Sequence, residues 1–459
     1  MNHLLLTPLD TLFFRDGRPM SGALAGHGAA WPLPTVANAA LHAALHDAQR
    51  SSALTGTSHR HDHMRGTERH LKDTRCFGSL TSAGPFPVSP DGTWYFPRPL
   101  DLTGGTLAPT LVPHGKTGHS SLPTPLTHTL ISNQPPTKNS LAKDWLSGDD
   151  FSAYLAGRTG KPRNAHDDDE VYLAESSIGI AIDSATGTTG QGDAQGKIYS
   201  THSLRMQKDW RLGLLASTDE KQLDGTRRDL IAQDLYPQSR GHIILGGQQR
   251  VCTVQLKTTP SLPLPFGLTR PEDFKPGPDG QFIVKWVLLT PAIFPAITAG
   301  TSKRNTPRQA HGGGWLPTWI DPQTGQVLLQ FVDKNERERR RKLNYAGQGY
   351  RSEENAVALP ARLIAARVPK PIPVTGWANG DESLGEESKS GAKSTHLAVP
   401  AGSVYYFACD SATDAAQLAA ALNWHGGDTT GTTIRNRRST LLGEKGFGLG
   451  VCGTWTPHA

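Results

Sequence analysis

Short apolar runs separated by polar and glycine-bearing stretches make up the hydrophobic pattern of this chain. Near its start, residues 4–6 and 11–14 are apolar and short enough to be strands. A stretch with several glycines follows as far as Trp31, and valine and alanine then recur at helical spacing from residue 36 to residue 48. Thr35 stands at the N-cap position of that segment. The chain is therefore expected to open as strand, long loop and helix.

The last 60 residues repeat this outline. Residues 404–409 form a compact aromatic and apolar run typical of a strand. A helix is expected from about residue 412 to residue 424, capped by Asp410 or Ser411 and ended by glycines at 426 and 427. A final strand is expected over residues 449–455. The two ends together predict an α+β protein with two ferredoxin-like (RRM-like) domains that carry long loop insertions.

The middle of the chain holds further short strands and three irregular stretches. Strands are expected at residues 178–182, 243–245, 251–254, 283–289 and 327–332. Loops are expected at residues 103–145, 186–196 and 377–395, where Gly, Ser, Thr or charged residues follow no period. A proline-rich stretch near residue 260 has linker character, which predicts an N-terminal domain over residues 1–259 and a C-terminal domain over residues 260–459.

Composition narrows the class of protein. The 49 glycines and 34 prolines favour strands and loops over a helical bundle. Apolar runs are too short for a membrane span, and the first residues are too polar for a signal peptide. The four cysteines are scattered, which argues against a zinc ribbon or a disulfide scaffold and favours a reducing cytoplasm. The net charge of +6 suits an anionic partner.

The densest local signal is the glycine cluster at residues 443–450. Glycines allow a backbone to approach a phosphate or ribose closely. A dinucleotide-binding fingerprint needs a helix after the glycines, but the nine residues after Gly450 favour a strand. Contact with a nucleic-acid backbone remains, next to the simpler interpretation of a plain turn. Arginines at 435, 437 and 438 lie just upstream and favour the nucleic-acid interpretation.

Two other glycine-bearing segments carry cations. Arg15, Gly17, Arg18 and His27 lie in the long N-terminal loop, where two arginines could contact phosphates or bases. A structural turn is the alternative there. A weaker basic group accompanies the strand at residues 240–250 and includes Arg240, Gly246, Gly247 and Arg250. The basic residues between Lys334 and Lys342 are more typical of a solvated surface than of a nucleic-acid contact.

Catalytic and metal-binding patterns are weak. The histidines at 59, 61, 63 and 70 lie in a polar stretch typical of an exposed loop, and the acidic run from Asp167 to Glu170 is more typical of a solvated loop than of a Mg²⁺ site. The sequence contains no GxSxG, no HExxH and no interpretable Cys–His pair. Nothing in these patterns compels an enzyme, a metal site or a cofactor.

Seven segments in order resemble a known family. They are residues 12–19 (LFFRDGRP), residues 178–183 with 196–200 and 204–205, residues 245–250 (LGGQQR), residues 288–294, residues 376–377, residues 399–405 and residues 446–450 (GFGLG). Together they resemble the third-subunit family of the Cmr effector complexes of type III-B CRISPR systems, within the RAMP superfamily of RNA-binding proteins. Gln249 replaces an acidic residue of that pattern, Met20 stands where phenylalanine is expected, and insertions at residues 51–70 and 377–395 lie outside it.

The resemblance implies a non-catalytic, cytoplasmic, antiviral-defence subunit that binds the 5′ tag of CRISPR RNA (crRNA) and does not contact a membrane. It implies a large polymerase-type subunit and a backbone RAMP subunit as direct neighbours, and small subunits of the complex as indirect ones. A single-stranded tag needs cations, close backbone approach and aromatic stacking. The residues predicted to contact RNA are Arg15, Gly17, Arg18, His27, Tyr199, Gly246, Gly247, Arg250, Lys445, Gly446, Phe447, Gly448 and Gly450. Phe14 is either a further base-stacking residue or part of the core.

Two alternatives remain open. In the first, the chain is a RAMP endoribonuclease that processes CRISPR repeat RNA, with His27 as the general base. In the second, it is a metal-dependent hydrolase that uses the histidines at residues 59–63.

Overall fold

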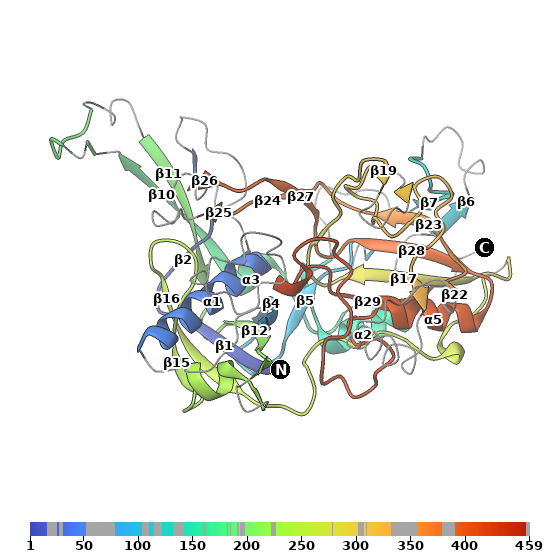
Figure 1. The fold of residues 1–459 in the computed structure, drawn as a ribbon, viewed down its shortest axis with the longest axis horizontal. Coiled ribbons are helices and arrows are strands. Elements are labelled where there is room, and N and C mark those ends of the chain that lie inside the picture. The colour runs from blue at the N-terminus through green and yellow to red at the C-terminus, as the bar shows by residue number, and fades with distance from the viewer. Residues whose placement is uncertain are drawn as a thin grey trace.

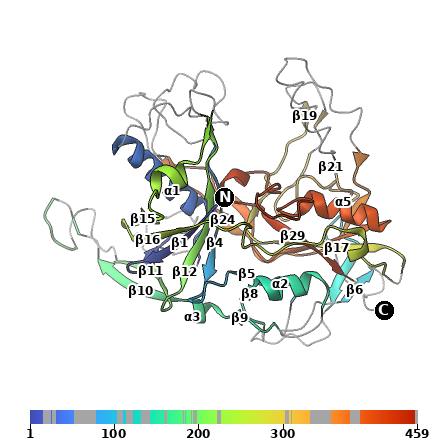
Figure 2. The same cartoon turned by 90° about the horizontal axis from the view of Figure 1, so that it is seen from below.

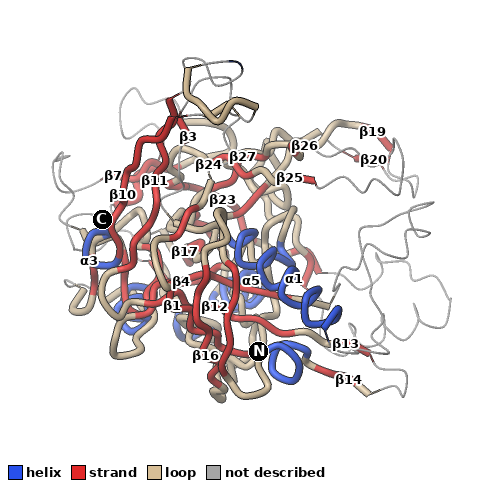
Figure 3. Tube along the Cα trace, turned by 90° about the vertical axis from the view of Figure 1, so that its left-hand side faces the viewer, coloured by secondary structure: helices blue, strands red, loops and turns tan. Residues whose placement is uncertain are grey.

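The computed structural model places two antiparallel sheets side by side, one in each half of the chain (Figure 1). The structure describes residues 1–15, 25–26, 31–51, 79–102, 110–113, 122–131, 142–158, 162–180, 182–183, 185–190, 192, 198–221, 226–277, 279–301, 307–308, 310–331, 357–378 and 391–455. Strands outnumber helices throughout (Figure 3). No helix within these ranges is long and apolar enough to cross a membrane.

The N-terminal half is built on a five-stranded sheet. Its strands, in spatial order, are β15 (Arg240–Ile244), β16 (Val251–Lys257), β1 (Asn2–Pro8), β12 (Arg211–Ser217) and β4 (Thr81–Val88). Leu4 and Leu6 alternate with Leu5 along β1, so they point to the opposite face and pack with α1 (Pro34–Ser51) and the short helix η3 (Ile231–Leu235). The expected opening strand and the helix are confirmed, but α1 begins at Pro34, so Thr35 lies in its first turn and is not the N-cap.

The C-terminal half repeats part of this strand order. Its sheet runs β23 (Ala361–Arg367), β28 (Val404–Cys409), β17 (Phe282–Leu288), β29 (Gly450–Trp455), and α5 (Ala412–Leu422) packs against it. From one edge of this sheet to the other, its strands are the second, third, first and fourth of the four along the chain. β1, β4, β12 and β16 have the same arrangement in the N-terminal sheet, and every neighbouring pair is antiparallel. The α+β class is therefore confirmed, while the boundary at residue 259 stays a prediction.

Both halves also contain smaller sheets. One contains β10 (Tyr172–Ile180), β11 (Ile198–Met206), β2 (Leu12–Phe13) and β3 (Ala25–Gly26). Two others contain β5 (Tyr95–Pro97), β8 (Trp145–Ser147) and β9 (Ala165–His166), and β18 (Ala292–Ile293), β27 (His396–Val399) and β24 (Ile372–Val374). The two-stranded pairs are β6 (Thr110–Pro113) with β7 (His128–Ile131), β13 (Glu220–Lys221) with β14 (Arg227–Arg228), β19 (Gly300–Thr301) with β20 (Pro307–Arg308), β21 (Gln330–Phe331) with β22 (Val357–Ala358), and β25 (Trp377–Ala378) with β26 (Gly391–Ala392).

Four short helices connect these strands: α2 (Gly148–Leu155), α3 (Asp168–Val171), η4 (Pro271–Asp273) and η6 (Gly443–Lys445). Two sequence expectations need correction. The strand expected at residues 327–332 is reduced to β21, because Val327 forms only an isolated bridge with Ile320. The stretches expected as loops also contain strands: the β6–β7 pair and the first residue of β8 lie within residues 103–145, and the β25–β26 pair lies within residues 377–395.

A buried polar cluster joins the segment around α2 to the C-terminal sheet. Lys285 on β17 is fully buried, donates to the backbone oxygen of Tyr154 at 2.7 Å and lies 3.5 Å over the Tyr154 ring. The buried carboxylate of Asp101 accepts hydrogen bonds from the hydroxyls of Tyr154 and Tyr406. Burial lowers the pKa of Lys285 to about 8. The apolar core around this cluster includes residues of both halves, among them Leu5, Leu215, Val287 and Trp455.

Candidate nucleic-acid interface

The N-terminal glycine-bearing loop starts beside the turn that joins β15 to β16. The backbone N–H of Gly247 donates to the backbone oxygen of Phe13 at 2.9 Å, just before Arg15. Gly246 has a φ of +82°, and a side chain there would collide with the backbone oxygen of Phe13. Arg15 is exposed, whereas Phe14 is only 2% exposed and belongs to the core. The turn thus serves as a support for the start of the loop.

Charged side chains surround this turn. The Arg250 guanidinium binds the Asp10 carboxylate at 2.7 Å and the side-chain oxygen of Gln248 at 3.1 Å. Arg205 on β11 approaches the other oxygen of Asp10 at 3.4 Å and pairs with Glu175. A hydrogen bond from the Thr11 backbone and the charges of the two arginines hold the pKa of Asp10 below its usual range. Arg250 therefore has a counter-ion within the chain, which an RNA phosphate would have to displace.

The far end of the loop is anchored at the seam between the two halves. The Trp31 ring N–H donates to the backbone oxygen of Pro85 at 2.9 Å. Leu33 packs in a small apolar cluster with Phe447. A side chain added at Gly446 would lie 3.3 Å from the Pro34 side chain and 2.9 Å from the Ser82 backbone oxygen. The C-terminal glycine segment and the beginning of α1 are therefore in close contact.

The glycines of residues 443–450 serve a different purpose from the one expected. Backbone N–H groups at Gly446 and Gly448 donate to the backbone oxygens of Gly443 and Pro291, at 3.0 and 2.7 Å. A side chain at Gly448 would come within 2.1 Å of the Ser439 nitrogen, and one at Gly450 within 2.2 Å of the Trp286 ring. These two amides already donate within the chain, so they offer no unpaired N–H to a phosphate, and RNA contact by Gly446, Gly448 and Gly450 stays a prediction. Close packing is what requires glycine here.

Phe447 also needs a correction. Its side chain is completely buried in the cluster with Ile293 and Val374, so it cannot stack on an RNA base in this conformation. Lys445 differs from Phe447 because its side chain is not buried. Its side chain is partly exposed and no described residue forms an ion pair with it. RNA contact by Lys445 stays a prediction.

The three arginines upstream of the glycines have structural partners. Arg435 pairs with Asp428 at 3.0 Å, and Arg438 donates to the Ala421 backbone oxygen near the end of α5. Arg437 donates to the Ser82 backbone oxygen at 3.3 Å, and burial lowers its pKa to about 10. Because these arginines have partners within the chain, they favour the nucleic-acid interpretation less than the sequence indicated.

The chain matches the family described as CRISPR-associated protein (Cas_Cmr3) over residues 4–455. This chain belongs to the Cas_Cmr3 family. The resemblance to a Cmr-complex subunit is thereby confirmed. No curated protein matches the chain in sequence.

Several solved structures of type III CRISPR proteins are similar to this Cas_Cmr3 family member. A type III-B Cmr-beta complex bound to cognate target RNA contains a chain 12% identical, with a TM-score of 0.39, over 88% of this chain and 86% of that chain. A Csm3–Csm4 subcomplex of the type III-A interference complex gives 9% identity and a TM-score of 0.32, over 88% and 92%. A Csm1–Csm4 cassette with AMPPNP gives 14% and 0.27, over 68% and 86%.

Several predicted residues of this family member lie outside the described part of the chain. These are Gly17, Arg18 and His27, together with the histidines at 59–70 and the basic stretch from Lys334 to Lys342. Tyr199 lies on β11 opposite Gly179, and only its backbone is described. Their proposed roles stay predictions.

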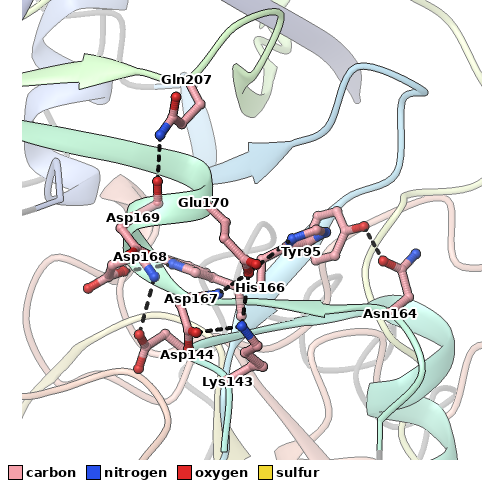
Figure 4. Close-up of polar contacts among 11 residues, drawn as sticks. Tyr95, Lys143, Asp144, Asn164, His166, Asp167, Asp168, Asp169, Glu170 and Gln207 are labelled. Atoms are coloured by element: carbon pink, nitrogen blue, oxygen red, sulfur yellow. Dashed lines mark hydrogen bonds and ion pairs between the residues drawn. The ribbon is translucent and has the colours of Figure 1, made fainter.

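The acidic run from Asp167 to Glu170 is explained by local structure (Figure 4). Asp167 and Glu170 form the capping box of α3, and Lys143 pairs with both carboxylates. Asp168 accepts a hydrogen bond from the Trp145 ring N–H at 2.8 Å. Among the residues that the structure describes, no group of three potential ligands could hold a metal ion.

The sequence analysis missed an apolar surface on the β10–β11 pair, which projects from the body as a ribbon (Figure 1). Ile178, Ile180 and Ile198 are 79, 56 and 54% exposed, and the register sets Ile180 directly opposite Ile198. Ile182, beyond β10, is 64% exposed. Alternation along the strand puts Ile178 and Ile180 on one face. The spacing of isoleucines at 178, 180 and 182 was the available signal, but their exposure depends on the ribbon leaving the core.

Proposed function

We propose that this chain is a non-catalytic RNA-binding subunit of a type III-B CRISPR effector ribonucleoprotein, and that it binds the 5′ tag of crRNA in the cytoplasm. The observation that carries the proposal is the anchoring of the N-terminal loop. One end rests on the Gly246–Gly247 turn and the other contacts the C-terminal glycine segment at Pro34. Arg15 and Lys445, which have no described ion-pair partner, stand at these two ends.

The strand orders support two ferredoxin-like domains of the RAMP type. Each half contains four antiparallel strands in the ferredoxin order, and a helix packs on each sheet. In the C-terminal half, the described residues between β17 and β23 contain no helix and instead include the short strands β18 to β22.

The exposed ribbon supports a second part of the proposal, in which the chain docks the large polymerase-type subunit to the backbone RAMP subunits. Isolated apolar residues are common on protein surfaces, but clusters on a projecting element are typical of interaction sites. Ile178, Ile180 and Ile198 form such a cluster. Small subunits of the complex would then be indirect partners.

Filter binding with a labelled tag oligonucleotide tests RNA recognition. We expect Lys445→Glu and Arg15→Glu each to weaken binding and to reduce the salt slope by about one. Gly446 is kept in these variants, because its φ of +100° and its contact with Ser82 would make an alanine there disruptive to the fold. Lys275→Glu, which changes an exposed lysine of the C-terminal half, is the matched control. Unchanged affinity and slope in both site variants would refute the assignment.

The non-catalytic part of the proposal has its own test. Purified wild-type protein is incubated with repeat RNA in the presence of EDTA. We expect no cleavage. Cleavage that disappears in His27→Ala would instead establish the endoribonuclease alternative.

A further inference from the structure

β15 is an additional strand at the margin of the N-terminal sheet (Figure 2). It pairs with β16 on one side and with no other described strand. The ferredoxin order in this half is complete with β16, β1, β12 and β4, so β15 is an extension of that sheet. A strand in this position presents one row of its backbone groups to its surroundings.

The register identifies which backbone groups face outward. Leu245 donates to the Arg250 backbone oxygen at 2.8 Å, and Leu256 donates to that of Ser239 at 2.9 Å. Hydrogen-bonded pairs alternate along an antiparallel ladder, so Gly241 and Ile243 bond to β16. The N–H and C=O groups of Arg240, His242 and Ile244 therefore point away from the sheet, and no described residue bonds to them.

The side chains of these three residues share one open face with β16. Arg240, His242 and Ile244 are exposed, and so are Gln255 and Lys257 across the strand pair. Arg240 lies opposite Gln255, which places Lys257 two residues away on the same face. Arg240, His242 and Lys257 form no ion pair with a described residue, whereas Arg250 at the end of the turn pairs with Asp10.

We propose that β15 is a docking edge for an extended acidic segment of a partner protein, which adds to the sheet as a further strand. The outward backbone groups supply main-chain hydrogen bonds, and alternate side chains supply specificity. Carboxylates of the added segment would face Arg240 and His242, and an apolar residue would face Ile244. Lys257 on β16, one strand further in, adds positive charge to the same face. This inference does not depend on the RNA-binding proposal.

Two features favour a peptide over RNA on this face. Sheet surfaces that bind single-stranded RNA present aromatic side chains for stacking, and the exposed residues of β15 and β16 include no aromatic ring apart from the His242 imidazole. Ile244, which is 55% exposed, gains from contact with an apolar side chain and gains nothing from a phosphate.

The test uses the full chain and a fluorescent synthetic peptide with the pattern Glu-Thr-Glu-Thr-Val, whose two glutamates and valine share one face and match Arg240, His242 and Ile244. We expect the peptide to bind and to slow hydrogen exchange at the amides of Arg240, His242 and Ile244. His242→Pro removes an outward N–H and leaves the bonds to β16 intact. It should weaken binding about tenfold or more beyond the loss seen in His242→Ala, because the alanine variant removes only the imidazole and keeps the outward N–H. The double variant Arg240→Glu, Lys257→Glu should abolish binding.

The same assay contains the results that would overturn the proposal. Failure of the peptide to bind, or equal affinity of the proline and alanine variants, would exclude strand addition. An oligouridine is added as a competitor. If it displaces the peptide from wild type and does not bind the double variant, this face is an RNA surface. Self-association of the wild-type chain that disappears in His242→Pro would identify a second copy of this chain as the occupant. A thermal unfolding curve of each variant that overlays wild type confirms that the fold is retained.

Discussion

At the residue scale, the same residue type serves different purposes in different surroundings. Gly246 and Gly446 both have positive φ, and both lie where a side chain would collide with a neighbouring backbone oxygen. Their requirement for glycine follows from packing, so it says nothing by itself about a ligand. Free cations are more informative. Arg15 and Lys445 have no described ion-pair partner, while Arg250, Arg435 and Arg437 are bound within the chain.

Lys285 yields a prediction about pH. Its pKa in the folded chain is about 8, below the ordinary value for lysine. Between pH 8 and the ordinary lysine pKa, the unfolded chain binds one more proton than the folded chain. The free energy of unfolding therefore rises with pH in that window, by at most about 1.4 kcal/mol per pH unit. Urea unfolding of wild type and Lys285→Met at several pH values measures this.

The difference between wild type and Lys285→Met reports the titration of Lys285 alone, because the buried tyrosines and cysteines titrate in both proteins. The free energy of unfolding of wild type minus that of Lys285→Met should increase from pH 8 to pH 10. A difference that stays constant over this range would show that Lys285 does not change its protonation on folding.

At the element scale, the β10–β11 ribbon is expected to contribute to assembly with other subunits and little to the stability of the chain itself. The isoleucines on its projecting part contact little of the body, so removing their apolar surface costs the isolated chain little. The same substitution at a buried position such as Ile243 on β15, which is 4% exposed, removes buried surface and inserts a hydroxyl.

We therefore predict opposite results for one substitution at two places. Ile178→Thr with Ile180→Thr should change the free energy of unfolding by less than about 0.5 kcal/mol per residue and should reduce co-purification with the other subunits. Ile243→Thr should lower the free energy of unfolding by about 2 kcal/mol. Normal assembly of the ribbon variant would argue against the ribbon as a docking surface.

At the scale of the whole molecule, the two halves share a core. Leu5, Leu215 and Phe86 of the first half pack in one cluster with Val287 and Trp455 of the second. The contact of Gly446 with Ser82 and Pro34 adds a second junction. Separating the halves would expose this apolar surface to water.

We predict that the fragments 1–259 and 260–459 do not fold separately, although each contains a complete sheet. Each fragment expressed alone should lack a cooperative thermal transition, and the intact chain should unfold in a single transition. Calorimetry on all three proteins is the measurement. A cooperative transition in either fragment that matches the intact chain would mean that the shared core contributes little.

Local sequence patterns were enough for some of the elements, whereas β4, β12 and β23 of the two main sheets were not expected. The strand at residues 404–409, the helix from residue 412 and the opening strand–loop–helix depend on alternation, capping and helical spacing within a short window, and β28, α5, β1 and α1 lie where these patterns put them. The α+β class and the family followed from the same local segments.

The sequence by itself determined several of the elements, the class and the family, because these depend on residues that are neighbours along the chain. Only the tertiary structure decided which polar groups are free. Whether the amides of residues 446–448 have acceptors, whether Phe447 is buried and whether Arg250 meets Asp10 all depend on residues distant in sequence. The exposure of Ile178 and the outward edge of β15 have the same origin, since burial and strand pairing are properties of the assembled sheets.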